Sequence, residues 1–239
     1  MSNDLPWIDV GTTSTPVLLT ERCIPSFLKH FTDRSEYRLR WIYHLDQYPL
    51  PGLEQFWEEN LQQAVRVSKL FDDALLMASR VNQSYGTSCC RVMSYAENPY
   101  FHIEDDKEWI KDFSLKDIKE RMQRANADAF NFHHKGLTGS TAPNYSNLGV
   151  VQKLLENAPK PHWKITETVW NSLALKLGII TIGRTEEETG KQIGRRRWEG
   201  DWWVDVGKTA LYERGLRTRT HPARIYIDKV TGKPCRGRL

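Results

Sequence analysis

The sequence predicts an α+β protein with a mainly helical body and a small basic C-terminal module of helices and strands. Between residues 53 and 157, apolar side chains recur at three- and four-residue steps, which is typical of amphipathic helices. Beyond Pro159 the expected order is helix, short strand, helix and two strands. This is the element order of a winged-helix-like module, so the sequence predicts that architecture for the C-terminal part.

Composition supports a globular chain. Its 239 residues are enough to bury a large core, and 39% hydrophobic with 27% charged residues is ordinary for a globular protein. No run approaches 18 apolar residues, and the polar N-terminus does not resemble a signal peptide. The four cysteines form no C-x-x-C pair. We therefore expect a cytoplasmic protein with no membrane partner, no metal and no cofactor.

The first part of the chain predicts an arm and then a strand. Residues 1–30 are expected to be irregular, because the polar, turn-rich stretch 11–16 follows a short apolar beginning. Residues 37–45 alternate apolar and polar side chains, which favours a half-buried strand. A capping box formed by Asp33 and Glu36 leaves a helix open as the alternative there.

The middle of the chain is expected to be mostly helical. Residues 53–82 predict one long helix, and the apolar residues 89–95 a strand. A further helix begins after Ser114, which is an N-cap residue with Asp117 in the first turn. A short helix is predicted over residues 148–157.

A break in the chain is expected at Ala158-Pro159-Lys160-Pro161. We accordingly divide the sequence into an N-terminal arm (1–30), a helical body (31–158) and a basic C-terminal module (161–239). Within the module, Thr166 as N-cap and Gly178 as stop predict a helix. The other expected elements of the module are a β-branched run at 179–182, a short helix after Thr185, and strands at 202–206 and 224–227.

Positive charge is concentrated at the C-terminal end. Residues 206–239 hold nine Lys or Arg and two acids, a net charge of +7, whereas residues 1–180 hold 20 basic and 22 acidic residues. Arginine dominates and is interleaved with aromatic residues, and arginine both pairs with phosphate and stacks on flat rings. We therefore expect this region to contact an RNA or DNA backbone. The candidate nucleic-acid-binding residues are Arg195, Arg196, Arg197, Lys208, Arg214, Arg217, Arg219, Arg224, Lys233, Arg236, Arg238, Trp202 and Trp203.

The functional hypothesis that follows is a non-catalytic, nucleic-acid-binding subunit of a larger nucleoprotein assembly, for example an RNA-guided effector complex or a phage or plasmid nucleoprotein machine. Other protein subunits would be its further partners. The same arginines would also attract an acidic protein, so a phage virion or scaffold protein is the alternative. Simple solvation of a charged surface is a third explanation of the cations.

A metal-dependent nuclease is the remaining alternative. Glu104, Asp105 and Asp106 are consecutive, and carboxylate oxygens hold divalent cations. Three acids before a helix are often merely solvated, and no second carboxylate motif accompanies them. The sequence also lacks a P-loop, a nucleophile elbow, and a kinase or dinucleotide-binding fingerprint. These observations favour a binding protein over an enzyme.

Overall fold

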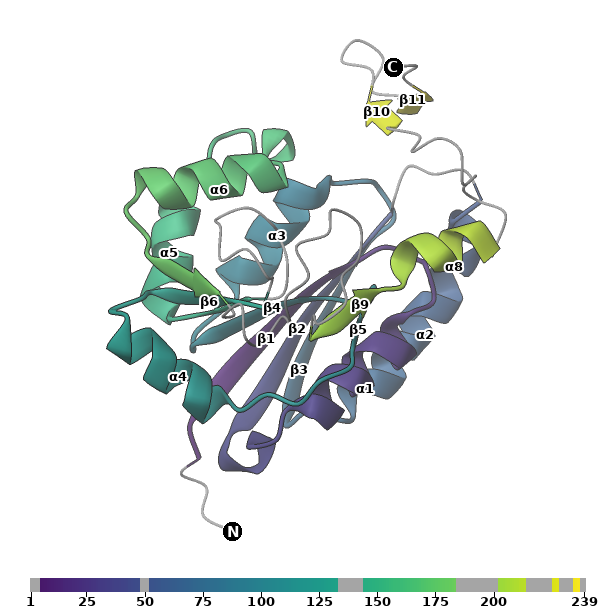
Figure 1. Ribbon diagram of the computed structural model, residues 1–239. Helices are drawn as coiled ribbons and strands as arrows, with labels where there is room; N and C mark the ends of the chain where they lie inside the picture. Colours follow the sequence, from purple (N-terminus) through teal and green to yellow (C-terminus); the bar gives the residue numbers. More distant parts are fainter. Residues whose placement is uncertain are drawn as a thin grey trace, which may run out of the picture.

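The fold is built on a seven-stranded mixed sheet with the strand order β3-β2-β1-β4-β7-β6-β8 (Figure 1). The computed structural model describes residues 5–47, 52–132, 144–183, 202–213, 225–227 and 234–236. The strands of the sheet are β1 (Trp7–Ser14), β2 (Arg38–Asp46), β3 (Asp73–Ser79), β4 (Tyr100–Glu104), β6 (Ala129–Asn131), β7 (Asn144–Ser146) and β8 (Thr181–Gly183).

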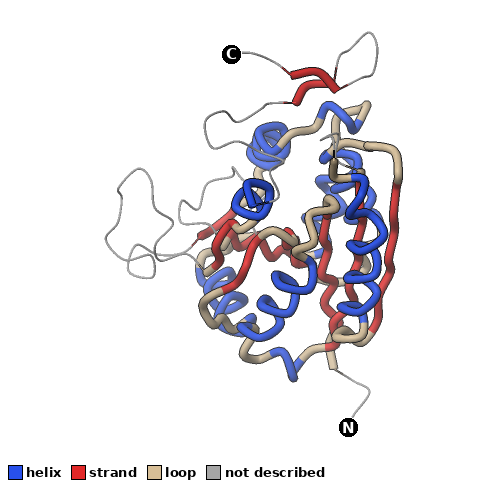
Figure 2. Tube along the Cα trace, turned by 90° about the vertical axis from the view of Figure 1, so that its right-hand side faces the viewer, coloured by secondary structure: helices blue, strands red, loops and turns tan. Residues whose placement is uncertain are grey.

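Helices cover both faces of this sheet, so the body is a three-layer α/β structure (Figures 1 and 2). One face carries α1 (Thr20–His30), α2 (Trp57–Ser68) and α4 (Leu115–Arg124), whose buried side chains share a core with the sheet. The other face carries α3 (Tyr85–Ser94), α5 (Leu148–Glu156) and α6 (Glu167–Lys176). Among the described residues, no helix combines the length and apolar composition that crossing a membrane requires.

Alternation along the strands sends side chains to the two helical layers in turn. On β1, Ile8 and Val10 enter the core beneath α1 and α2. On β4, Phe101 and Ile103 join the same core, whereas Tyr100 packs against α3 and α5 on the opposite face. The first core is rich in aromatic rings that meet edge to face, as Phe27 and Phe101 do at 5.3 Å between ring centroids.

The strand directions determine where a ligand can enter. Strand β1 is parallel to β2 on one side and to β4 on the other, and β2 is parallel to β3. Strand β7 is antiparallel to both β4 and β6. From β1 the chain runs to β2 and β3 on one side, and it then crosses to β4 on the other side of β1. The carboxyl ends of β1 and β4 are therefore a topological switch point.

Two small ribbons complete the described structure. Strand β5 (Lys107–Trp109) pairs with β9 (Trp203–Asp205), and β10 (Ile225–Ile227) pairs with β11 (Pro234–Arg236). Helix α8 (Gly207–Glu213) follows β9, and its residue Ala210 packs with Val17, Leu19 and Cys23 beside α1. Helix α8 is far from β1 and α1 in the sequence, but it packs against the loop that connects them.

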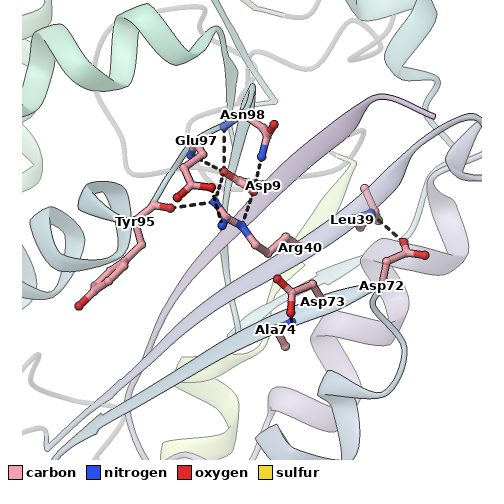
Figure 3. Close-up of polar contacts among 9 residues, drawn as sticks. All are labelled: Asp9, Leu39, Arg40, Asp72, Asp73, Ala74, Tyr95, Glu97 and Asn98. Carbon is pink, nitrogen blue, oxygen red and sulfur yellow. Dashed lines mark hydrogen bonds and ion pairs between the residues drawn. The ribbon is translucent and has the colours of Figure 1, made fainter. Parts of the chain in front are cut away.

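A buried ion pair joins the central strands near their amino ends (Figure 3). The Asp9 carboxylate of β1 is fully buried, and Arg40 of β2 donates to it through Nε at 2.8 Å and Nη2 at 2.9 Å. The backbone N–H groups of Glu97 and Asn98 also donate to Asp9, at 2.7 and 3.0 Å. One carboxylate therefore connects β1, β2 and the turn that leads into β4.

The predicted fold class, a mainly helical body with a winged-helix-like module, is wrong. The long helix expected over residues 53–82 ends at Ser68, and Asp73–Ser79 forms β3 instead. The apolar run Leu75-Leu76-Met77-Ala78 fits a helical face by spacing, but it lies in a parallel edge strand. Its side chains pack on both faces of the sheet, Leu76 against one core and Leu75 and Met77 against the other. The strand expected at 89–95 is part of helix α3, and the irregular arm of residues 1–30 contains β1 and α1.

Other element predictions are confirmed. Residues 38–46 form a strand, and the helix after Ser114 begins with the Asp117 N–H donating to Ser114 Oγ at 3.3 Å. Helices α5 and α6 also lie where they were expected, and the backbone of Gly178 after α6 has a φ of +68°. The division of the chain at Pro159–Pro161 stays a prediction.

We expect Asp9→Asn to lower the free energy of unfolding by about 3 kcal/mol or more, because it removes the buried carboxylate that faces the mostly buried guanidinium of Arg40 and leaves only the exposed carboxylate of Glu97 as a counter-charge. Urea denaturation measures this loss. Glu58→Gln, which breaks an exposed pair with Arg80, is the control and is expected to cost less than about 1 kcal/mol. Equal losses in the two variants would contradict the structural role of the Asp9–Arg40 pair.

Candidate active site

Acidic and hydroxyl side chains gather at the carboxyl ends of the three central strands. Ser14 ends β1, Asp46 ends β2, and Glu104 ends β4, followed directly by Asp105 and Asp106. The β1–β2 register sets Ser14 opposite Leu45, next to Asp46, and the β1–β4 register sets Thr13 opposite Glu104. Open α/β sheets bind their ligands at this edge, at the switch point. We therefore take this cluster as the candidate active site.

Glu104 and Asp106 share one cation. The Lys107 ammonium lies 2.8 Å from Asp106 Oδ1 and 3.3 Å from Glu104 Oε2, and the Lys107 side chain is only 10% exposed. Glu104 and Asp106 remain partly open to solvent. The site therefore presents two carboxylates and an ammonium group that are positioned together by the turn between β4 and β5.

The Asp105 side chain points to the face of the sheet opposite Glu104, toward α1, and is buried. Ser14 Oγ and Thr20 Oγ1 both donate to its Oδ2, the second at 2.9 Å. Asn60 extends this network, because its Nδ2 donates to Ser14 Oγ at 3.4 Å and to the Tyr43 hydroxyl at 2.8 Å. Burial raises the pKa of the Asp105 carboxyl to about 7, although the two hydroxyl hydrogen bonds oppose the rise. Asp105 therefore holds β1, α1 and β4 together from inside.

Asp46 organises the other side of the edge. Its carboxylate accepts hydrogen bonds from the Gln83 N–H at 2.9 Å and from Ser88 Oγ at 3.0 Å, which connects β2 to α3. Burial raises the pKa of Asp46 to about 6. Burial also lowers the pKa of the neighbouring His44 to about 4, with Arg91 as a smaller cause, so that imidazole is neutral at neutral pH.

The start of α8 lies directly against the acidic turn. The Val206 N–H donates to the Asp106 carbonyl oxygen at 2.9 Å. A Cβ atom placed on Gly207 would lie 2.5 Å from Asp106 Oδ2, so only glycine allows the carboxylate to approach the backbone this closely. The chain beyond residue 201 thus helps to position Asp106.

Most of the residues predicted to bind nucleic acid lie outside the described residues: Arg195, Arg196, Arg197, Arg214, Arg217, Arg219, Arg224, Lys233 and Arg238. Lys208, Trp203 and Arg236 belong to α8, β9 and β11. Trp202 is buried, 9% exposed, and packs against Phe130 and Phe132. Its ring is therefore part of the core.

The acidic triplet at 104–106 stood out in the sequence, but as a nuclease cluster. The contributions of Ser14, Asp46 and Gly207 were missed, because these residues lie 32 to 193 residues apart and come to this edge only through the sheet register and the packing of α8. Lys107 was missed because its position between the two carboxylates depends on the turn after β4. The available signal was local. A short, mostly apolar run, Tyr100 to Ile103, ends in consecutive acids, which is typical of a buried strand that delivers carboxylates to a sheet edge.

No protein-family model and no curated protein matches this sequence. Solved structures do share its fold. S. aureus TarS has a TM-score of 0.54 at 11% identity, over 75% of this chain and 35% of TarS. TarS 1–349 has a TM-score of 0.54 at 12% identity, over 87% of this chain and 64% of that one. The mannosyltransferase PcManGT from Pyrobaculum calidifontis has a TM-score of 0.53 at 8% identity, over 77% and 55%.

These likenesses show a Rossmann-like α/β architecture that resembles the GT-A fold of these glycosyltransferases. At 8–12% identity they show the fold alone, and this chain spans only 35–64% of the length of these neighbours. The prediction of a non-catalytic nucleic-acid-binding subunit is overturned by this finding, and so are the nucleic-acid partner and the absence of enzymatic activity. The physical reason is that clustered cations attract any anion, so charge identifies neither a fold nor a reaction.

The raised pKa of Asp105 predicts a pH-dependent stability. The folded state binds a proton that the unfolded state releases near pH 3.8, so this contribution is complete below that pH and is lost as pH rises toward 7. We expect the unfolding free energy of the wild type to fall relative to Asp105→Asn over this window, by at most about 1.4 kcal/mol per pH unit. Urea denaturation at pH 5, 6, 7 and 8 measures the difference.

The control for this experiment is Asp73→Asn, which alters an exposed carboxylate at the start of β3. Its pH profile is expected to run parallel to the wild type. A parallel profile for Asp105→Asn as well would contradict the assignment of a protonated Asp105 in the folded state.

Proposed function

We propose that this protein is a glycosyltransferase that uses a nucleotide-sugar donor. The observation that carries the proposal is the position of Glu104, Asp105 and Asp106 at the carboxyl end of β4, beside the β1–β4 switch point of a GT-A-like sheet. Structures of this fold include TarS 1–349 in complex with UDP-GlcNAc and PcManGT in complex with GDP-Man and Mn²⁺. These complexes support a nucleoside diphosphate sugar as the donor class.

The site offers groups suited to each part of such a donor. The carboxylates of Glu104 and Asp106 accept hydrogen bonds from ribose or sugar hydroxyls. In sugar transfer, an acceptor hydroxyl oxygen loses its proton and forms a bond to the anomeric carbon, while the bond from that carbon to the diphosphate breaks and negative charge develops on the leaving phosphate. The Lys107 ammonium lies between the two carboxylates, where its charge would stabilise that phosphate.

The Mn²⁺ in the PcManGT complex raises the question of a metal here. A divalent ion would need the facing oxygens of Glu104 and Asp106, and the Lys107 ammonium lies within 3.3 Å of both carboxylates. Within the described parts of the chain, no three His, Cys, Asp or Glu side chains gather in a way that could hold a metal. The residues in this arrangement do not fit a divalent ion, and we assign the cationic role to Lys107.

The proposed activity is tested by incubating the full chain with UDP-GlcNAc, UDP-glucose and GDP-mannose and measuring the release of UDP or GDP. We expect slow release from at least one donor, and binding of UDP or GDP by calorimetry. Glu104→Gln and Asp106→Asn are expected to weaken that binding about 10- to 100-fold, because each removes a charged hydrogen-bond acceptor.

The matched control is Glu120→Gln on the exposed surface of α4, which is expected to bind nucleotide as the wild type does. If the folded wild type binds neither UDP nor GDP, with or without Mn²⁺, the proposed function is wrong.

Removal of metal provides a separate prediction. We expect an excess of EDTA to change the affinity for UDP or GDP less than about twofold, because Lys107 supplies the positive charge at the site. Lys107→Met is expected to weaken binding about tenfold or more, whereas Lys69→Met at an exposed position on the end of α2 is not. Loss of wild-type binding in EDTA would assign the charge to a metal instead.

A further inference from the structure

A pocket of about 120 Å³ lies between the sheet and helices α3, α5 and α6. We call it the sheet-face pocket. Strands β4, β7 and β6 form its floor, and the three helices form its walls. The residues that matter for its chemistry are His102, Asn131 and Asn144 on the floor, and Met93, Val151 and Trp170 on the walls.

The floor carries a row of polar side chains. Asn144 of β7 is the register partner of His102 on β4 and of Asn131 on β6. Neighbouring strands are about 4.8 Å apart, so the three side chains lie next to one another across the sheet. His102 and Asn131 are 6% and 4% exposed. A polar stripe at this depth is unusual, because interior sheet faces are normally apolar.

One atom of this row has no hydrogen-bond partner among the residues that the structure describes. His102 Nε2 is buried and unpaired, while its Nδ1 lies 3.3 Å from the Tyr100 hydroxyl. Burial lowers the pKa of His102 to about 4, so its imidazole is neutral at neutral pH. A buried nitrogen without a partner is unfavourable unless a bound molecule pairs with it.

The lining also defines the charge and size of an occupant. No Asp, Glu, Lys or Arg is among the described residues that line the pocket, so a charged ligand would find no counter-charge there. A purely apolar ligand would leave His102 Nε2 unpaired. A cavity of about 150 Å³ holds a benzene molecule, so a pocket of about 120 Å³ holds no more than a single ring.

The pocket adjoins the candidate active site. Alternation along β4 places His102 and Glu104 on the same face of the sheet, two residues and about 7 Å apart. On β1, Gly11 is the partner of His102 and Thr13 the partner of Glu104. The floor of the pocket therefore continues directly to the acidic edge where the donor is proposed to bind.

We propose that the sheet-face pocket binds one uncharged sugar ring. Such a ring has a hydroxyl edge that pairs with His102 Nε2 and an apolar C–H face that packs against the indole of Trp170. The inference rests on the proposed function and deepens it, since the ring would be either the sugar of the donor or that of the acceptor.

The test is saturation-transfer NMR on the full chain with free glucose, mannose and N-acetylglucosamine, with and without UDP, combined with calorimetric titration of UDP and UDP-GlcNAc. We expect the wild type to bind at least one of these sugars, free or as part of the nucleotide sugar. His102→Phe keeps a ring of similar size and removes the unpaired nitrogen, so we expect it to stay folded and to lose about tenfold or more in sugar affinity.

Trp170→Leu is expected to have the same effect as His102→Phe, and Trp163→Leu, which alters an indole that is 55% exposed, is the control without effect. If the variants remove only the extra affinity of UDP-GlcNAc over UDP, the ring belongs to the donor; if they affect only free sugar, it belongs to the acceptor. Either result supports the proposal.

The inference is overturned if UDP or GDP binds but no sugar contacts the protein, or if His102→Phe binds sugar as the wild type does. In both cases the proposed function stands, because nucleotide binding is measured separately. Sugar binding without any nucleotide binding would instead refute the proposed function and keep the pocket.

Discussion

The ion pair between Asp9 and Arg40 determines how the central strands sit against one another. Both oxygens of the buried Asp9 carboxylate accept hydrogen bonds from Arg40, and the turn at Glu97 and Asn98 donates to the same group. A buried carboxylate is tolerated only with this degree of pairing. Because β1, β2 and β4 are aligned at their amino ends by one residue, their carboxyl ends also meet in a defined register, and Ser14, Asp46 and Glu104 come together there.

At that edge, three consecutive acids have three different environments. Asp105 points into the α1–α2 face and is enclosed by hydroxyl groups, whereas Glu104 and Asp106 remain accessible and share Lys107. The alternation of side chains along β4 and the turn that follows it produce this separation. Asp105 therefore serves the structure, and its two neighbours are left for a ligand. A sequence of three acids is read correctly only when each is assigned to its face of the sheet.

The same alternation connects the acidic edge to the sheet-face pocket. Tyr100, His102 and Glu104 occupy one face of β4, so a buried neutral imidazole and a partly exposed carboxylate are successive groups on a single surface. In the proposed function, the charged edge would hold the nucleotide part of a donor, and the uncharged pocket would hold a sugar ring. Helix α8, although distant in sequence, completes the arrangement by bringing Gly207 against Asp106.

Local pattern was enough to predict several elements: the alternating strand at Arg38–Asp46, the capped helix after Ser114, and α5 and α6. The residues alone also singled out the acids at 104–106. What they could not decide was whether the apolar run in 73–79 is helix or strand, because a strand that packs apolar side chains on both faces of the sheet lacks the period-two signal. Nor could they show that β1 is central, that Lys107 lies between Glu104 and Asp106, or that His102 faces a pocket. Those facts depend on contacts between residues far apart in the chain, which only the packing of the sheet and its two helical layers brings about.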